Sequence, residues 1–237
     1  MSVLPFVVIA AIIGLVAFGV VRSRKLARDR REALAGLAGE LGMGFDPARD
    51  TSHDDRYANF EVFRRGQSRA AFNTIAGETE IAGGRHAVVM GDFIYRVSRE
   101  SGKSRRTTTH IFSYAIIQSP YPGVTDLLIR PESVFDKIGA AIGFEDIDFE
   151  SAEFSKKFLV KSPDKRFAYD VITPNMMEML LAEGKPPIID LERGMLLLTD
   201  GRRRWQPEQF REHLAFADTF FGLWPDHVVL GLFERSR

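Results

Sequence analysis

The chain of 237 residues contains no cysteine, which excludes disulfides, zinc–thiolate sites and cysteine nucleophiles. It has only two tryptophans, and its 32 basic and 32 acidic residues leave no net charge. Catalytic motifs are also missing: there is no G-x-S-x-G nucleophile elbow, and the five histidines show neither H-x-x-x-H nor H-x-H spacing. The sequence therefore predicts no cofactor and identifies no catalytic residue.

The longest apolar segment stands at the N-terminus. No charged residue occurs from Val3 to Val21, a run of nineteen residues. As an α-helix this run would be roughly 28 Å long, close to the ~30 Å hydrocarbon thickness of a bilayer. We therefore expect residues 1–21 to form a single transmembrane anchor. A cleaved secretory signal fits the sequence less well, because no basic residue precedes the apolar run.

A strongly basic segment follows the apolar run directly. Of the ten residues after Val21, six are basic and one, Asp29, is acidic. Under the positive-inside rule, this asymmetry predicts a single-pass protein of the cell membrane with its N-terminus outside and its C-terminal domain in the cytoplasm. The residues expected at the membrane interface are Arg22, Arg24, Lys25, Arg28, Arg30 and Arg31.

The rest of the chain has a different charge balance. Six of the 32 basic residues and one of the 32 acidic residues lie in the basic segment, which leaves 26 basic and 31 acidic residues elsewhere. A mildly acidic body argues against nucleic-acid binding, which needs a basic footprint. The expected partners are therefore the lipid bilayer and another protein.

Residues 22–44 are expected to form a basic juxtamembrane helix. Leu34, Leu37 and Leu41 recur at i, i+3 and i+7, which places them on one side of a helix. This stripe could pack on the domain that follows or on a second copy of the chain. We favour packing on the domain, and a homodimer through the anchor or this helix stays open as an alternative.

The remaining residues, 45–237, predict one α+β domain with a mostly antiparallel sheet and helices packed on one side of it. Short runs rich in aromatic and β-branched residues, separated by glycine and proline, indicate strands. The expected strands are 60–63, 70–75, 86–97, 108–118, 126–129 and 153–161, with a hairpin formed by 188–191 and 195–199. The expected helices are 132–142, 164–170, 174–182 and one that begins at Pro207 and extends to Trp224.

One basic cluster resembles part of a phosphate-binding loop. Gly102-Lys103-Ser104 matches the end of a P-loop, but Val97 stands where the first glycine of that motif is required. We therefore expect the triplet to form the tip of a hairpin, which also carries Arg99, Glu100, Arg105 and Arg106. A solvated edge that prevents aggregation is the favoured interpretation. Contact with lipid headgroups or an acidic partner is the alternative.

The acidic residues of the segment 145–150 alternate with apolar residues. If the segment is extended, Asp146, Asp148 and Glu150 share one face, because strand side chains alternate. Three carboxylates on one edge are candidate ligands for Ca²⁺ or Mg²⁺. The segment lacks the ligand order of an EF-hand loop, so a solvated acidic face is favoured over a metal site.

Two further clusters have ordinary structural interpretations. His53 stands beside Asp54, as in a catalytic dyad, but adjacent residues of a chain point apart, so we expect a polar loop. Arg202–Trp205 could contact lipid or RNA, although a turn with a packed tryptophan before a helix is the favoured interpretation.

Two segments resemble an uncharacterised family of bacterial membrane proteins. They are Phe149–Asp164 and Ala168–Glu178, in which the similarity lies in the positions of aromatic residues, Asp and Pro. The resemblance implies a bacterial source and transfers no activity. The sequence as a whole predicts a membrane-anchored interaction or regulatory domain, and the alternative is a membrane-associated, metal-assisted hydrolase.

Overall fold

Eight strands form one sheet in the computed structural model of the chain, which describes residues 4–101, 104–132 and 145–236. Their order is β1-β2-β3-β4-β8-β7-β5-β6, and every neighbouring pair is antiparallel. The strands are β1 (Gly44–Asp46), β2 (Gln67–Ile81), β3 (Gly84–Ser101), β4 (Ser104–Gln118), β5 (Leu127–Pro131), β6 (Phe158–Lys161), β7 (Ile188–Glu192) and β8 (Met195–Thr199). This part of the architecture, an antiparallel sheet with helices, agrees with the sequence analysis.

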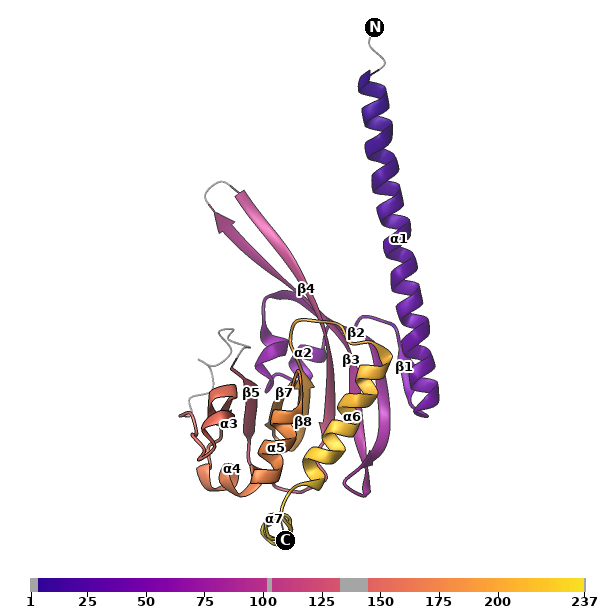
Figure 1. Ribbon diagram of the computed structural model, residues 1–237. Coiled ribbons are helices and arrows are strands. Elements are labelled where there is room, and N and C mark those ends of the chain that lie inside the picture. The colour runs from indigo at the N-terminus through magenta and orange to yellow at the C-terminus, as the bar shows by residue number, and fades with distance from the viewer. Residues whose placement is uncertain (1–3, 102–103, 133–144, 237) are drawn as a thin grey trace.

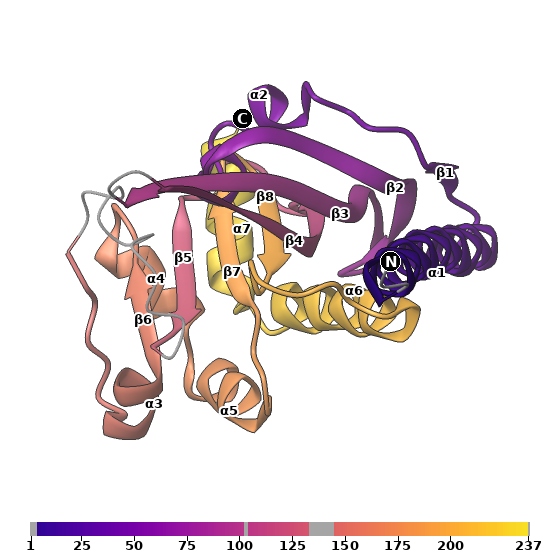
Figure 2. The same cartoon turned by 90° about the horizontal axis from the view of Figure 1, so that it is seen from above.

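Helices cover the two faces of the sheet unequally. The helices are α1 (Leu4–Glu40), α2 (His53–Arg56), α3 (Ala152–Lys157), α4 (Lys165–Val171), α5 (Pro174–Ala182), α6 (Pro207–Gly222) and α7 (Asp226–Arg235), with a 3₁₀-helix η1 (Glu61–Arg64). Figure 1 shows α1 extending far beyond the rest of the molecule, and Figure 2 shows α5, α6 and α1 on one side of the sheet with α2 on the other. The larger hydrophobic core lies on the α6 side, and a smaller aromatic core lies beneath α2 and η1.

Tight turns set the register of two hairpins. Between β7 and β8, Arg193 and Gly194 both have positive φ, at 51° and 74°. Between β2 and β3, Ala82 and Gly83 have φ of 48° and 78°. Two consecutive residues with positive φ are the signature of a two-residue type I′ turn, whose twist matches that of the strands it joins. The hairpin predicted around Gly194 is therefore confirmed.

The lower part of α1 packs on the domain. Leu34 and Leu37 are buried in the larger core, and Leu41 packs against it. An ion pair between Glu40 and Arg211 joins the end of α1 to α6. The prediction that this leucine stripe packs on its own domain is confirmed, and the helix ends at Glu40, earlier than the predicted boundary at residue 44.

The prediction of a transmembrane helix is wrong. In the described part of the chain, no helix combines the length and the hydropathy that crossing a bilayer requires. Although α1 has 37 residues, the basic segment that begins at Arg22 and the packing of Leu34 and Leu37 on the domain occupy its second half. The location at a cell membrane stays a prediction.

Two other expectations differ from the structure. Residues 60–63 form most of η1 instead of a strand, because Phe60 and Phe63 pack on the sheet as part of the aromatic core. Only the end of 153–161 is a strand: α3 precedes it, with Ser151 capping the Phe154 amide. Helix α7 was not predicted, and the helix expected at 132–142 falls almost entirely outside the described residues.

Candidate functional site at the base of α1

A bidentate ion pair fastens α1 to the sheet. Arg30 donates from Nε and Nη2 to the two carboxylate oxygens of Asp92, at 2.7 and 2.6 Å. The Asp92 side chain is 0% exposed and that of Arg30 is 11% exposed, so both charges are withdrawn from water. Paired N–H donors on one carboxylate fix both distance and orientation, so this contact sets how α1 lies against β3.

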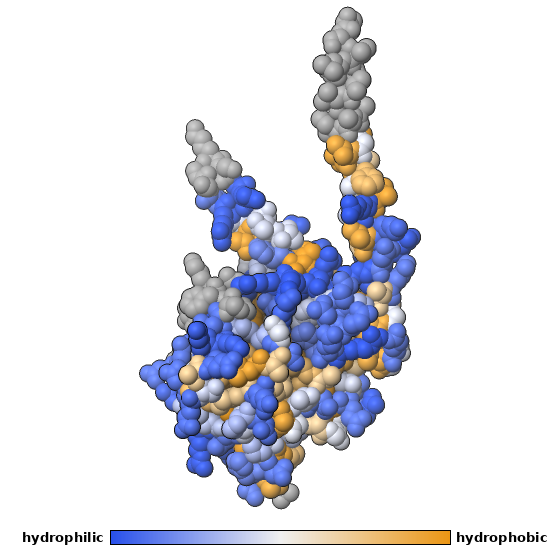
Figure 3. All heavy atoms as spheres, viewed as in Figure 1, coloured by the Kyte–Doolittle hydropathy of each residue, from blue (hydrophilic) through white to orange (hydrophobic). Residues whose placement is uncertain are grey.

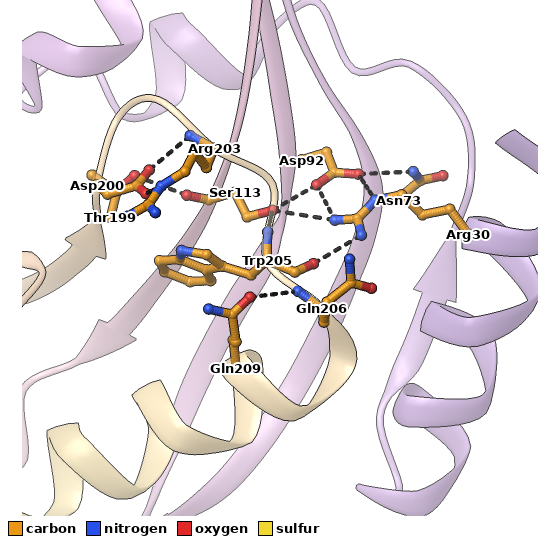
Figure 4. A network of polar contacts seen from close by, with 10 residues as sticks. All are labelled: Arg30, Asn73, Asp92, Ser113, Thr199, Asp200, Arg203, Trp205, Gln206 and Gln209. Carbon is orange, nitrogen blue, oxygen red and sulfur yellow. Dashed lines mark hydrogen bonds and ion pairs between the residues drawn. The ribbon is translucent and has the colours of Figure 1, made fainter. Parts of the chain in front are cut away.

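Three further segments meet at this ion pair, as Figure 4 shows. Ser113 of β4 lies opposite Asp92 in the strand register, and its Oγ donates to Asp92 at 2.7 Å and accepts the Trp205 amide at 2.9 Å. Arg30 Nη1 donates to the Trp205 carbonyl at 2.8 Å. Asn73 Nδ2 of β2 donates to Asp92 at 3.1 Å. The Asp92 carboxylate therefore accepts four hydrogen bonds, which offset the cost of burying its charge.

A β-bulge brings Asn73 into this network. The register between β2 and β3 shifts between Phe72 and Ile75, and Asn73 has a positive φ of 52°. Bulges of this kind redirect a side chain out of the regular pleat. Gly91 makes room for the bulge, since a Cβ at that position would lie 2.9 Å from the Asn73 carbonyl oxygen.

Trp205 connects the network to α6. Its ring is buried and stacks on His213 with 3.8 Å between centroids. The Gln206 amide donates to Gln209 Oε1 at 2.9 Å, and Pro207 occupies the first turn, so the chain enters α6 immediately after Trp205. The packed tryptophan before a helix is the arrangement that the sequence predicts.

A groove lies on the other side of Trp205, between α6 and the segment that joins α5 to β7. Its two parts have volumes of about 540 and 500 Å³ and share His213 and Lys185. Burial lowers the pKa of His213 below its ordinary value, so the neutral imidazole is favoured there. Apolar walls come from Met179 and Phe216. The groove is open, and its chemistry is that of a binding surface more than of an enclosed reaction chamber.

Nearer its N-terminus, α1 carries apolar side chains that lie exposed and are not covered by any described part of the chain. Between Ile13 and Val21, six large apolar side chains are between 44% and 72% exposed. They are Ile13, Leu15, Val16, Phe18, Val20 and Val21. Figure 3 shows these residues above the body of the molecule, followed toward the domain by basic residues. Contiguous exposed apolar area of this kind marks a surface that is covered in use.

The residues predicted at a membrane interface divide into two groups. Arg22, Arg24, Lys25 and Arg31 are exposed. Arg28 is also exposed and lies 3.5 Å from Glu32, whereas Arg30 belongs to the buried network. The buried role of Arg30 has a signal in the sequence: Arg30 precedes Leu34 and Leu37 by four and seven residues and therefore shares their face of the helix.

The acidic candidates for a metal site do not converge. Ile147 and Phe149 are buried while Asp146, Asp148 and Glu150 are exposed, so the predicted alternation is confirmed. The Asp146 carboxylate lies 3.1 Å from Lys161 Nζ, which neutralises it. Among the described residues, no group of three histidine, cysteine or acidic side chains could hold a metal ion.

His53 and Asp54 also point to different partners. His53 is buried among the rings of the aromatic core, with 4.7 Å between its ring centroid and those of Tyr57 and Phe63. This burial lowers its pKa from 6.5 to about 4. Asp54 instead accepts a hydrogen bond from Arg69 Nε at 2.6 Å. The pair is therefore not a catalytic dyad, and His53 acts as a packed, neutral ring.

Comparison with known proteins gives a likeness of fold. No protein-family model and no curated protein sequence matches the chain. A solved structure, that of the mycobacterial trehalose monomycolate transport factor A, TtfA, is similar with a TM-score of 0.58 at 12% sequence identity. The match covers 84% of this chain and 97% of that one. At this identity the likeness concerns the fold alone, and the resemblance to an uncharacterised bacterial family stays a prediction.

Proposed function

We propose that this protein is an interaction module attached to a lipid surface through the apolar segment Ile13–Val21 of α1. The observation that carries the proposal is the uncovered row of apolar side chains at one end of a helix whose other end is locked to the domain. Burying one large aliphatic or aromatic side chain is worth about 1.5–3 kcal/mol, so six of them give a strong drive toward an apolar environment.

The adjacent charges favour lipid over a second copy of the chain as the cover. Arg22, Arg24 and Lys25 are exposed directly beside the apolar segment. Side-by-side parallel packing of two copies would bring these cations together, whereas an anionic lipid surface attracts each of them by about 1 kcal/mol. Lipid therefore satisfies the apolar and the basic parts of α1 at once.

The contacts of α1 with the sheet would also orient the domain relative to the lipid surface. Because Arg30 is held by Asp92 and Trp205, the domain and its groove are fixed in orientation relative to the helix. A partner protein at the surface would meet the same face of the domain in every molecule. We therefore propose a scaffold or regulatory role and assign it no reaction.

Flotation of the full-length protein with phosphatidylcholine vesicles tests the proposal. We expect the wild type to float with vesicles and the Phe18→Asp variant to remain at the bottom of the gradient. Leu230→Asp, which changes an exposed apolar residue of α7, is the matched control and should float like the wild type. A wild type that stays lipid-free and forms a stable dimer in analytical ultracentrifugation would overturn the proposal.

A further inference from the structure

The hairpin formed by β3 and β4 extends beyond the sheet. Arg96 is the last residue of β3 that pairs with β2, and Tyr114 is the first residue of β4 that pairs with β8. Residues 97–101 and 104–108 therefore pair only with each other, and we call them the hairpin arm. Figure 1 shows the arm leaving the body on the same side as α1. An isolated two-stranded ribbon is marginally stable in water, so its length calls for an explanation.

The arm concentrates positive charge in a way that costs stability. Arg99 and Arg106 are directly opposite each other in the register, and Glu100 is opposite Arg105. All three arginines are exposed, and within the described residues none of them forms an ion pair with a carboxylate. Like charges directly opposite in a strand pair are destabilising. An external anion between the two guanidinium groups would remove that cost.

Protection against aggregation explains the arrangement less completely. Charged side chains on an exposed strand hinder its pairing with other chains. Placing two arginines opposite each other adds repulsion within the arm, which this role does not require. Guanidinium groups form bidentate hydrogen bonds with phosphate, and two of them at one site can share one phosphate or bind two neighbouring ones. The arm therefore has the chemistry of a phosphate contact.

The position of the arm relative to α1 indicates where such phosphate groups would lie. In the view of Figure 3, the charged part of the arm reaches about the level at which α1 changes from apolar to basic residues. A lipid surface that covers the apolar segment of α1 would have its headgroups at that level. The basic residues of α1 and those of the arm would then face the same layer of phosphate groups.

We infer that the hairpin arm is a second lipid contact, in which Arg99 and Arg106 bind the phosphate groups of anionic lipids. The inference rests on the proposed attachment of α1 and adds to it tighter binding to lipid that carries negative charge. Two contacts on one side of the molecule would also hold the domain at a fixed tilt to the surface. The mildly acidic remainder of the chain favours lipid over nucleic acid as the source of phosphate.

Partitioning of the full-length protein between buffer and two kinds of vesicle tests the inference. One kind contains phosphatidylcholine alone, and the other also contains phosphatidylglycerol. We expect the Arg99→Gln/Arg106→Gln variant to partition about 10- to 30-fold more weakly than the wild type into the anionic vesicles, and to match the wild type on neutral vesicles. The control is Arg166→Gln/Arg235→Gln, which removes the same charge from exposed positions on α4 and α7.

The possible outcomes distinguish a failure of the arm contact from a failure of the α1 attachment. If the arm variant and the control partition alike into anionic vesicles, the inference fails while the attachment of α1 stands. If the wild type binds neither kind of vesicle, both fail. If the arm variant loses binding to polyuridylate or polyglutamate but keeps its partitioning into vesicles, the arm serves another anion and the inference is overturned.

A second measurement leaves the arginines in place. Because the chain has no cysteine, a fluorophore on Thr107→Cys would label the arm alone. We expect its emission to shift to the blue with anionic vesicles and to stay unchanged with neutral ones. An unchanged emission with anionic vesicles that bind the protein would contradict contact between the arm and the lipid.

Discussion

The buried carboxylate of Asp92 has its charge balanced by Arg30, and the two residues come from segments 62 positions apart. Removing one partner of a buried pair leaves an unpaired charge in the protein interior. We expect Arg30→Ala to lower the free energy of unfolding by about 3–5 kcal/mol, measured by urea denaturation. The free energy of unfolding of Arg30→Lys should fall between those of the wild type and Arg30→Ala, because an ammonium group keeps the charge but cannot reproduce the bidentate geometry.

The control for this prediction is Arg31→Ala, which removes an exposed neighbour with the same charge. Its effect should stay within about 0.5 kcal/mol, as is usual for surface substitutions. Equal losses for the two variants would mean that the Arg30–Asp92 pair has no special part in stability.

His53 predicts a pH dependence of stability. Burial lowers its pKa from 6.5 in the unfolded chain to about 4 in the folded protein. Between these values the unfolded chain binds a proton that the folded protein excludes, so the free energy of unfolding falls as the pH drops from about 6.5 toward 4, by up to about 3 kcal/mol. The contribution is fully present above pH 6.5.

The His53→Phe variant should remove this contribution while keeping an aromatic ring in the core. We expect its urea midpoint to change less between pH 7 and about 4.5 than that of the wild type. His227→Gln, an exposed histidine of α7, should behave like the wild type. An identical pH profile for His53→Phe and the wild type would show that His53 does not titrate in this range.

Single residues could be interpreted from the sequence where the information was local. The alternation of buried and exposed side chains around Ile147 could be predicted because strand side chains alternate, and the structure confirms it. Asp92 is visible as a charge within an apolar run, but its partner is not, because nothing in the sequence links it to Arg30. The assignment of Arg30 to an interface followed its charge and overlooked the helical face it shares with Leu34.

The bulge in β2 depends on the absence of a side chain in the neighbouring strand. A Cβ on residue 91 would approach the Asn73 carbonyl oxygen to 2.9 Å and the Thr74 Cα to 3.1 Å, and both are backbone atoms that cannot move freely. We expect Gly91→Ala to destabilise the fold by about 1–3 kcal/mol through overpacking, measured by thermal or urea unfolding.

Gly36→Ala provides the opposite case within the same chain. Gly36 is exposed on α1, and a Cβ there would meet nothing within 4 Å. Its replacement should stabilise the protein by about 0.5–1 kcal/mol, because alanine loses less backbone entropy in a helix. A destabilisation of similar size in both variants would contradict the role given to the bulge.

Elements were predictable where a turn or a helix start lies next to them. The hairpin at Gly194 and the helix that Thr173 caps both follow from neighbouring residues. The 3₁₀-helix at Glu61–Arg64 could not be predicted in this way. Its apolar residues give the same pattern whether the segment is a strand or a short helix packed on a sheet. Strand order was also out of reach, since β4 pairs with β8 across about eighty residues.

The molecule as a whole has two extensions on one side of the body, and both are joined to the same network. We expect spin labels on Ser23→Cys and Thr107→Cys to give a narrow distance distribution in pulsed electron paramagnetic resonance. Adding Arg30→Ala should broaden it, because α1 then loses its joint with β3. The absence of native cysteine makes the two labels unique.

A broad distribution in the otherwise unchanged chain would contradict a fixed α1. The control for the labels is the same pair with Arg31→Ala, which should keep the narrow distribution. At this scale the apolar and basic parts of α1 could be read directly from the sequence, but the way α1 is attached to the domain could not. That attachment rests on contacts between residues far apart in the chain.

One uninterrupted strand runs from the joint to the end of the hairpin arm. β3 contains both Asp92 and Arg99, seven residues apart, which corresponds to about 24 Å of extended chain. A contact made by Arg99 is thus linked through the backbone of β3 to the carboxylate that binds Arg30. The basic end of the arm and the ion pair that holds α1 therefore belong to one continuous element, β3.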